Sequence, residues 1–183
     1  MKVPANYPRQ CERRAHTRDG TEYFIRPIVP EDLQRELAFA RALSEESRYH
    51  RLMYVLHEPT EAQLAPLIHL DYERNMALVA LYGPESEQQI IGVARYARDD
   101  DGAAYEFAVA VADEWQGRGV GTRLLEELFE YARTRGLRRL YGRVLNDNAR
   151  MLSLARALGL TVTQNDDDPH TATVALDVSA LRG

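Results

Sequence analysis

Apolar residues in the middle of the chain follow the two-residue period of β-strands. Three runs carry this pattern: MALVALYG (76–83), QIIGVARYA (89–97) and AAYEFAVAVA (103–112). Gly83 and Pro84 separate the first two runs, and DDDG (99–102) separates the last two; both stretches are turn signals. The pattern therefore predicts three consecutive antiparallel strands.

The spacing of apolar residues changes after residue 119. They then recur on one helical face at positions 120, 124, 125, 128, 129 and 132. This spacing predicts an amphipathic helix, and Gly136 directly after the stripe is typical of a helix end.

Shorter patterns predict the remaining elements. Helices are expected over 30–43, with Pro30 in the first turn, over 44–56, capped by Ser44, and over 59–70, interrupted by Pro66. A further helix is expected over 148–158, and strands are expected over 21–28, 137–145, 161–164 and 171–178. This order predicts a mixed α+β sheet with helices on its faces.

Composition and charge narrow the function classes. The 183 residues are 45% apolar and 28% charged, as in an ordinary globular protein. No apolar run approaches the roughly 20 residues that span a bilayer, and no hydrophobic block follows the first charges as in a secretory signal. A net charge of −5 argues against a nucleic-acid-binding surface. The single cysteine, Cys11, excludes an internal disulfide and suits a reducing cytoplasm.

The length and the absence of a linker predict one domain. Residues 1–20 contain two prolines and a DG turn signal, and we expect them to be a polar leader. Residues 21–183 are expected to form the single domain.

Three glycines, Gly117, Gly119 and Gly121, lie between the last of the three strands and the long helix. The first turn of a helix has unpaired N–H groups and a partial positive charge, so it can bind an anion. Glycine lets that backbone approach a bulky phosphate, and Arg118 and Arg123 could add charge-assisted hydrogen bonds. A pyrophosphate is the favoured occupant, and a glycine-rich turn without a ligand is the alternative. The spacing matches neither the dinucleotide fingerprint nor a P-loop.

The string VADEWQGRGVGTRLLEEL resembles the GCN5-related N-acetyltransferase (GNAT) family. The acyl-CoA signature of that family, Gln/Arg-x-x-Gly-x-Gly/Ala after a strand, is matched by Gln116, Gly119 and Gly121. Asn148 matches a second family position, in the helix that borders the cofactor. The likeness covers about residues 21–178. It implies the GNAT-type fold, a central, mostly antiparallel twisted sheet of six or seven strands with helices on both faces.

The resemblance also implies a binding surface for acetyl-CoA as co-substrate, and it implies no metal. The backbone of the loop and the helix start would hold the CoA pyrophosphate, and a backbone N–H near Val109 or Val111 would face the thioester oxygen. The implied cofactor-binding residues are Val109, Ala110, Val111, Gln116, Gly117, Arg118, Gly119, Val120, Gly121, Thr122, Asn148 and Met151.

Within the family, IRPIVPEDL, LSEESRYHR, YEFAVAVADEWQGRGVG and VLNDNARMLSLARALG look like the acetyltransferase domain of bacterial Pat-type protein-lysine acetyltransferases. This likeness implies acetylation of a protein lysine, with an acyl-CoA synthetase-like protein as a candidate acceptor, and it leaves a homodimer open. Two other functions stay open. One is acetylation of a small amine such as a polyamine, an amino acid or an aminoglycoside, and the other is acyl-CoA sensing without catalysis.

Glu106 is the candidate general base. In YEFAVAVA the aromatic and valine residues share one face of the strand, and Glu106 shares the other face with three alanines. A carboxylate is costly to bury unpaired, so one interpretation is an ion pair with Arg95 or Arg143. The resemblance instead assigns the catalytic glutamate to this position. An amine attacks a thioester only as the free base, and a carboxylate can take its proton directly or through water.

One position departs from the family pattern. Many members have a tyrosine four residues before the glycine that ends the last helix, as the acid for the departing thiolate, and Ala155 stands there. Ser153 and water are the remaining candidates. A thiol with a pKa of about 8.5 is a fair leaving group unaided.

Other residues invite a functional interpretation. Trp115 is expected to pack, whereas Tyr49 and Arg51 are expected to line an acceptor cleft. The acidic stretches 99–101 and 166–168 are either solvated turns or a means of attracting a cationic acceptor. Five histidines show no metal-ligand spacing: His16, His50, His57, His69 and His170.

Overall fold

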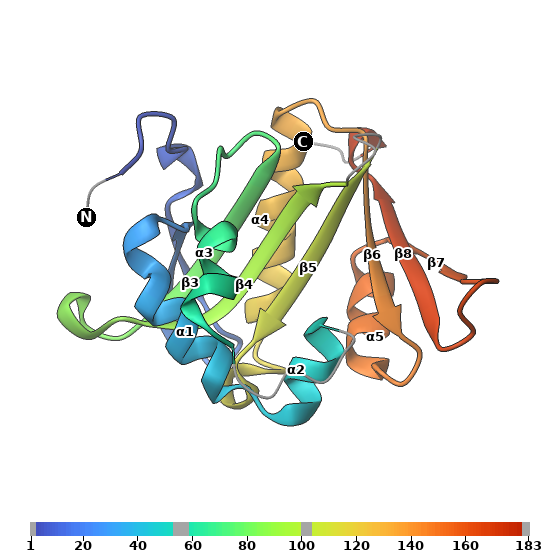
Figure 1. Ribbon diagram of the computed structural model, residues 1–183, viewed down its shortest axis with the longest axis horizontal. Coiled ribbons are helices and arrows are strands. Elements are labelled where there is room, and N and C mark those ends of the chain that lie inside the picture. Colours follow the sequence, from blue (N-terminus) through green and yellow to red (C-terminus); the bar gives the residue numbers. More distant parts are fainter. Residues whose placement is uncertain (1–2, 53–58, 100–103, 181–183) are drawn as a thin grey trace.

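The computed structural model describes residues 3–52, 59–99 and 104–180. These residues form one eight-stranded sheet in the order β1-β2-β3-β4-β5-β6-β8-β7, with helices packed on it (Figure 1). The strands are β1 (Arg13–His16), β2 (Glu22–Pro27), β3 (Asn75–Tyr82), β4 (Gln89–Arg98), β5 (Tyr105–Val111), β6 (Arg139–Leu145), β7 (Thr161–Gln164) and β8 (Thr171–Asp177). The α-helices are α1 (Leu33–Ala42), α2 (Glu45–Leu52), α3 (Glu61–Ile68), α4 (Val120–Thr134) and α5 (Ala149–Ala157).

Strands β5 and β6 are the only parallel neighbours among the described strands, and they separate along their length. Their register contains just two pairs, Tyr105 with Leu140 and Glu106 with Tyr141. Figure 1 shows the two strands close together at their starts and apart at their ends, with α2 lying near the ends. The sheet therefore opens where β5 continues beyond Glu106.

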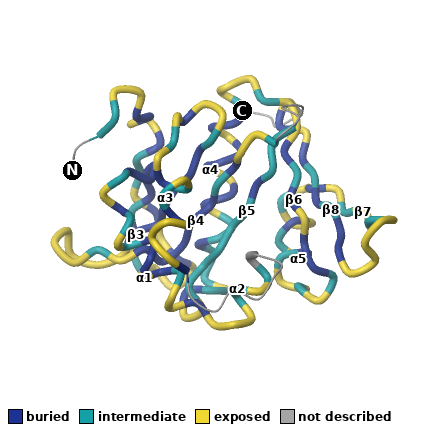
Figure 2. Tube along the Cα trace, viewed as in Figure 1, coloured by how far each residue is buried: buried dark blue, intermediate teal, exposed yellow. Residues whose placement is uncertain are grey.

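The two faces of the sheet carry different helices. Helix α4 covers one face, and all six apolar positions of its predicted stripe are buried. Phe129 of α4 meets Phe107 of β5 edge-to-face, with ring centroids 5.1 Å apart. On the opposite face, Phe39 of α1 and Ile68 of α3 belong to a second apolar cluster, which lies against β3 and β4. Figure 2 shows the buried trace concentrated in the central strands and in α4.

The predicted class is confirmed: a mostly antiparallel sheet with helices on both faces. The predicted count of six or seven strands is wrong, because β1 lies within the residues expected to be a polar leader. Its sequence RRAH contains only one apolar residue, Ala15, so it lacks the alternation of apolar and polar residues that predicts a strand. An ion pair joins β1 to the core in place of apolar side chains: Arg13 Nη1 lies 2.9 Å from a carboxylate oxygen of the buried Glu127 on α4.

Two helix predictions need adjustment. Helix α3 runs through Pro66 without a break, since the proline lies in its last turn, where one missing N–H leaves the remaining bonds in place. The helix expected over 44–56 is present to Leu52, and its last four positions lie outside the described residues. Across 3–52, 59–99 and 104–180, every helix is too short or too polar to cross a lipid bilayer.

Candidate active site

The glycine loop, residues 116–121, connects β5 to α4 and uses its glycines in two ways. Gly117 and Gly119 have φ angles of 73° and 96°, a left-handed region that side chains with a Cβ rarely adopt, and Gly119 caps α4. Gly121 serves packing instead, because a Cβ there would lie 3.3 Å from Cγ2 of Val111. Two glycines therefore shape the loop, and the third lets α4 approach β5.

The helix start beside this loop has the geometry of an anion site. The first α-helical hydrogen bond runs from Arg123 N–H to the Gly119 carbonyl at 3.0 Å, so the N–H groups of the three preceding residues lack an α-helical acceptor. A Cβ built on Gly117 would have no heavy atom within 4 Å, so the loop borders open space. Free donors beside open space fit a diphosphate group.

The two arginines expected to reach this anion are engaged elsewhere. Arg118 donates to Asp19 at 2.8 Å and to Thr21 at 3.0 Å, and its guanidinium carbon lies 4.3 Å from the Trp115 ring centroid. Arg123 pairs with the buried Glu127 of its own helix at 2.7 Å. Both side chains therefore fasten the loop and helix to the protein itself.

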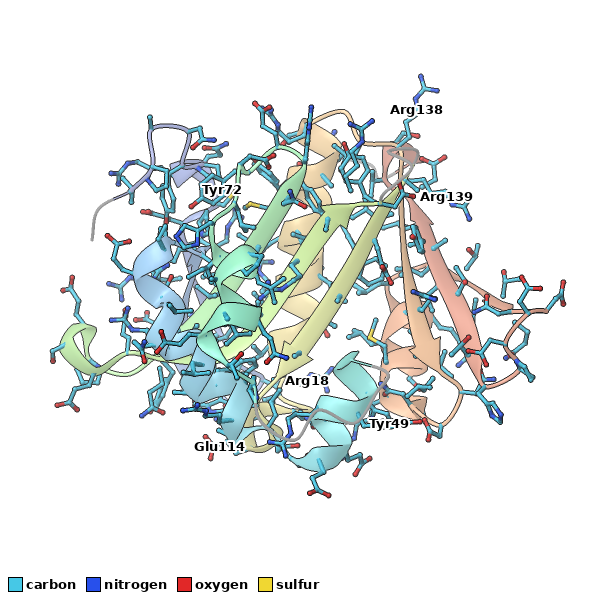
Figure 3. All side chains as sticks on the ribbon, viewed as in Figure 1. Arg18, Tyr49, Tyr72, Glu114, Arg138 and Arg139 are labelled. Carbon is cyan, nitrogen blue, oxygen red and sulfur yellow. The ribbon has the colours of Figure 1, made fainter. Side chains whose placement is uncertain are left out.

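A third arginine, Arg18 in the β1–β2 hairpin, lies over the loop instead (Figure 3). Its backbone N–H donates to the Arg118 carbonyl at 3.0 Å, and its Cγ lies 3.7 Å from the position of a Cβ on Gly119. Sequence reasoning missed Arg18 because it precedes Arg118 by a hundred residues. The one available signal was the turn-forming Asp19-Gly20 beside it.

Gln116, which matches the family signature, connects three elements. Its Nε2 donates to the Val111 carbonyl of β5 at 3.1 Å and to Ser47 Oγ of α2 at 3.0 Å. Its Oε1 accepts a hydrogen bond from Arg150 of α5. The Gln116 side chain therefore bridges both sides of the opening between β5 and β6.

Asp113, in the short turn between β5 and the glycine loop, fastens α2 to this end of β5. Its carboxylate accepts hydrogen bonds from the Ser44 N–H at 2.9 Å, Ser44 Oγ at 2.8 Å and Ser47 Oγ at 2.6 Å. Burial raises the pKa of Asp113, but the bonds from Ser47 and Ser44 outweigh it and bring the pKa below its ordinary value. Since these bonds favour the ionised form, the carboxylate that anchors α2 stays charged.

The main chain of β5 presents hydrogen-bonding groups to the opening. Ala112 N–H donates to the Ile91 carbonyl of β4 at 3.0 Å. Because N–H groups alternate in direction along a strand, the N–H of Ala110 also faces β4, and those of Val109 and Val111 face β6. At the start of the opening, β5 and β6 still approach closely. A Cβ built on Gly142 of β6 would lie only 3.0 Å from the carbonyl oxygen of Phe107 of β5, so this position favours glycine.

Glu106 lies on the face of β5 opposite α4. Tyr105, Val109 and Val111 pack against the apolar cluster that contains the buried face of α4. Ala110 packs against the second apolar cluster, which contains Phe39 of α1 and Ile68 of α3, as the predicted alternation requires. The Glu106 side chain is 43% exposed, and its Oε1 lies 3.7 Å from Nε of Arg143, which is 60% exposed. An exposed pair of this kind stabilises a protein by only about 0–1 kcal/mol, so it leaves Glu106 open to an approaching ammonium.

The other arginine considered as a partner for Glu106 is committed elsewhere. Arg95 donates to Glu36 of α1 at 2.6 Å and to the Leu67 carbonyl of α3 at 3.0 Å. The pair is nearly buried, with side-chain exposures of 12% for Arg95 and 6% for Glu36. Arg143 is therefore the arginine that neighbours the candidate base.

Helix α5 forms the far wall of the opening. Asn148 caps it, with Oδ1 accepting from the Met151 N–H at 3.0 Å. Ala155, at the position of the family's acid tyrosine, is fully buried and contributes packing alone. Ser153, the other candidate for that role, is exposed.

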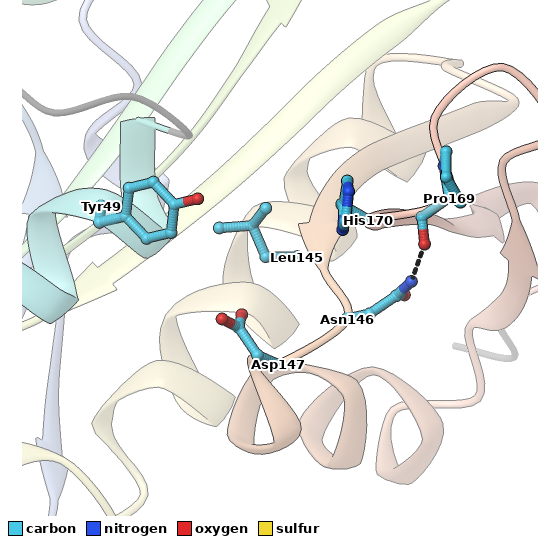
Figure 4. Close-up of a pocket in the computed structure, with 6 residues that line it drawn as sticks. All are labelled: Tyr49, Leu145, Asn146, Asp147, Pro169 and His170. Carbon is cyan, nitrogen blue, oxygen red and sulfur yellow. Dashed lines mark hydrogen bonds between the residues drawn. The ribbon is translucent and has the colours of Figure 1, made fainter.

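A cavity of about 230 Å³ lies between α2 and the end of β6 (Figure 4). Tyr49, expected to line an acceptor cleft, lies at its edge, whereas the Arg51 side chain and His57 lie outside the described residues. Trp115 is buried beside Tyr82, as expected for a packing residue. Within the described ranges, no cluster of three or more histidine, cysteine or acidic residues could hold a metal ion.

Comparison with known proteins agrees with this geometry. Residues 38–160 match the acetyltransferase (GNAT) family. An acetyltransferase of Pseudomonas aeruginosa is 36% identical over 156 residues, covering 85% of this chain and 83% of that protein. Acetyltransferase Pat of Mycolicibacterium smegmatis is 33% identical over 150 residues, covering 81% of this chain but only 44% of the relative.

A solved structure, the GNAT domain of S. lividans PAT, superposes with a TM-score of 0.85 at 29% identity, covering 93% of this chain and 99% of that domain. Family match and fold lead to one conclusion. The chain belongs to the GNAT family, as an acyl-CoA-dependent N-acetyltransferase.

Proposed function

We propose that this enzyme transfers an acetyl group from acetyl-CoA to a protein lysine and that Glu106 is the general base. The observation that carries the proposal is the position of Glu106. It is half-exposed, on the face of β5 opposite α4, at the residue where β5 and β6 part. The likeness to Pat and to the S. lividans PAT domain favours a protein lysine as acceptor.

The proposed cofactor site follows the opening. The unpaired N–H groups of Val120, Gly121 and Thr122, beside the open space at Gly117, would hold the pyrophosphate. The N–H groups of β5 that face the opening would bind the pantetheine arm and the thioester oxygen. Gln116 and Asn148 would act by fixing the walls, because their side chains already bond the protein.

In the proposed reaction, bound acetyl-CoA supplies the thioester that the amine attacks. A lysine ammonium has a pKa of about 10.4, so a base must take its proton near neutral pH. Glu106 takes this proton directly or through one water and passes it to solvent. The N–H of Val109 or Val111 donates to the carbonyl oxygen as negative charge develops there. As the C–N bond forms, the C–S bond breaks and CoA leaves as the thiolate; the second proton of the amine is lost to solvent, which protonates the thiolate to the free thiol. Ala155 cannot act as an acid, and a thiol with a pKa of about 8.5 leaves without one.

The test compares Glu106→Gln with Arg143→Ala, using release of free CoA thiol as the readout. Glu106→Gln is expected to lower kcat by roughly 100-fold or more and to leave CoA binding unchanged. The deficit should shrink as the pH approaches the pKa of the amine, because the free amine then needs no base. Arg143→Ala removes the neighbouring charge but keeps the base, so its kcat should stay within a few-fold of wild type. An unchanged kcat in Glu106→Gln across pH would remove Glu106 from the mechanism.

The acceptor is tested in the same assay with lysine peptides, an acyl-CoA synthetase and small amines, each with acetyl-, propionyl- and succinyl-CoA. Thiol release with the protein or peptides supports the proposal. Release with small amines alone would make the enzyme a small-amine acetyltransferase, and CoA binding without release would make the chain a sensor.

A further inference from the structure

The cavity beside α2 carries a second inference, which rests on the proposed function. This cavity is termed the Tyr49 pocket, and it is lined by Tyr49, Leu145, Asn146, Asp147, Pro169 and His170. Its volume is about 230 Å³. Pockets that enclose whole drug-sized ligands measure about 300–1,000 Å³, so this one suits a single side chain or the end of a longer molecule.

One wall of the pocket is held by its own hydrogen bonds. Asn146 Nδ2 donates to the Pro169 carbonyl at 2.8 Å and to Gln164 Oε1 at 3.0 Å, and its Oδ1 accepts from Gln164 Nε2 at 3.2 Å. These bonds join the end of β6 to the β7–β8 connection. With Asn146 committed to them, the groups left to meet a ligand are the Tyr49 phenol, the Asp147 carboxylate and the His170 ring (Figure 4).

The charge of the pocket favours a cation. Asp147 contacts His50 Nε2 at 3.3 Å and remains 71% exposed. Asp166 and Asp167 are exposed in the same connection that supplies Pro169 and His170. Three described arginines near these residues along the chain are engaged elsewhere. Arg48 donates to the carbonyls of Arg41 and Leu43, Arg143 lies beside Glu106, and Arg150 directs its guanidinium to Gln116. A carboxylate beside an aromatic ring is a suitable site for an ammonium or guanidinium group.

The position of the pocket relative to Glu106 sets the length of a matching acceptor. Tyr141 pairs with Glu106, and the alternation of β6 places Leu145 on the same face, four residues further along. At about 3.3 Å per residue, the pocket lies about 13 Å from the level of Glu106.

We propose that the Tyr49 pocket is an acceptor subsite that binds a second cationic group, about 13 Å along the sheet from the level of the base Glu106. In an extended peptide, which spans at most about 3.3–3.6 Å per residue, this group is an arginine or lysine about four residues from the target lysine. In a polyamine it is the far ammonium group. Asp147 binds the charge, and Tyr49 covers its apolar stem.

The experiment uses two peptides with the same single acceptor lysine and either arginine or its neutral isostere citrulline four residues away. Wild-type enzyme is expected to show a kcat/KM about fivefold higher for the arginine peptide, and Asp147→Asn is expected to abolish this preference. Tyr49→Ala should reduce it. Glu85→Gln, which removes one exposed acid from the β3–β4 connection, should keep the preference of the wild type.

The two sources of the cation are separated by a second arm, in which spermine is compared with butylamine. A preference for spermine that Asp147→Asn removes, with equal rates for the two peptides, assigns the subsite to polyamines. A loss of activity shared equally by all acceptors would mean that Asp147 only positions α2 through His50, and would overturn the subsite.

Preferences that survive in Asp147→Asn, or that fall equally in Glu85→Gln, would also overturn the subsite while acetylation itself continues. Wild-type enzyme that acetylates no peptide and no polyamine would refute the proposed function and the subsite with it.

Discussion

Two glycines at opposite ends of α4 provide a matched test of the glycine loop. Gly117 and Gly136 have φ angles of 73° and 76°, and a Cβ built on either one would meet no heavy atom within 4 Å. Alanine at either position therefore adds a methyl group in free space and forces the same backbone conformation on an L-residue. Only Gly117 lies at the proposed pyrophosphate site.

The expected magnitudes follow from this match. Holding alanine in the left-handed region costs about 1–2 kcal/mol. For a chain of this size, each kcal/mol shifts Tm by about 2–4 °C, so both variants should melt at similarly reduced temperatures. Binding should differ, because a methyl on Gly117 projects into the space proposed for the diphosphate. Loss of one hydrogen bond to a charged group costs about 1.5–3 kcal/mol, or roughly 10- to 150-fold in the Kd for CoA.

Calorimetry gives the Kd for CoA, and thermal unfolding gives the stability. The fluorescence of Trp115 offers a second binding signal, because it is the single tryptophan of the chain and lies beside Arg118 of the loop. Equal CoA affinity in Gly117→Ala and Gly136→Ala would refute the placement of the diphosphate at this loop, whatever the two melting temperatures.

Two further predictions concern the buried ion pair and the opening of the sheet. Burial raises the pKa of Asp32, but its hydrogen bonds with the Arg26 guanidinium, at 2.6 and 2.7 Å, outweigh it and hold the pKa below its ordinary value. Its stabilising effect is therefore full above about pH 4 and is lost as the pH falls through the lowered pKa, so Asp32→Asn should cost about 3–5 kcal/mol at pH 7 and less below pH 4. Urea unfolding at both pH values measures this, and an equal cost at both would contradict it. Gly142→Ala places a Cβ 3.0 Å from the Phe107 carbonyl oxygen and should lower the unfolding free energy by about 1–3 kcal/mol, whereas an unchanged denaturation midpoint would mean that the strands adjust freely.

Most of the fold could be predicted from the spacing of apolar residues along the chain. The α4 stripe and the two faces of β5 follow from apolar periodicity, because one face of each element meets the core. Strand β1 could not be found this way, since three of its four residues are charged or polar and its pairing with β2 is a tertiary contact.

The glycine loop was predictable as a backbone feature but not in its side-chain contacts. Ser47 bonds Gln116 across 69 residues of chain, and Asp19 bonds Arg118 across 99. Local spacing contains no information about such partners. Both side chains therefore bond the protein itself, although the family signature had suggested contact with the cofactor.

The threefold bonding of Gln116 constrains how sequences of this kind can diverge. Its amide meets donors and acceptors from β5, α2 and α5 at once, so a replacement must satisfy Ser47 and Arg150 together. A change of acceptor preference that alters α2 at Ser47 would therefore also require a change at Arg150 of α5. We expect positions 47, 116 and 150 to change in concert among homologous sequences.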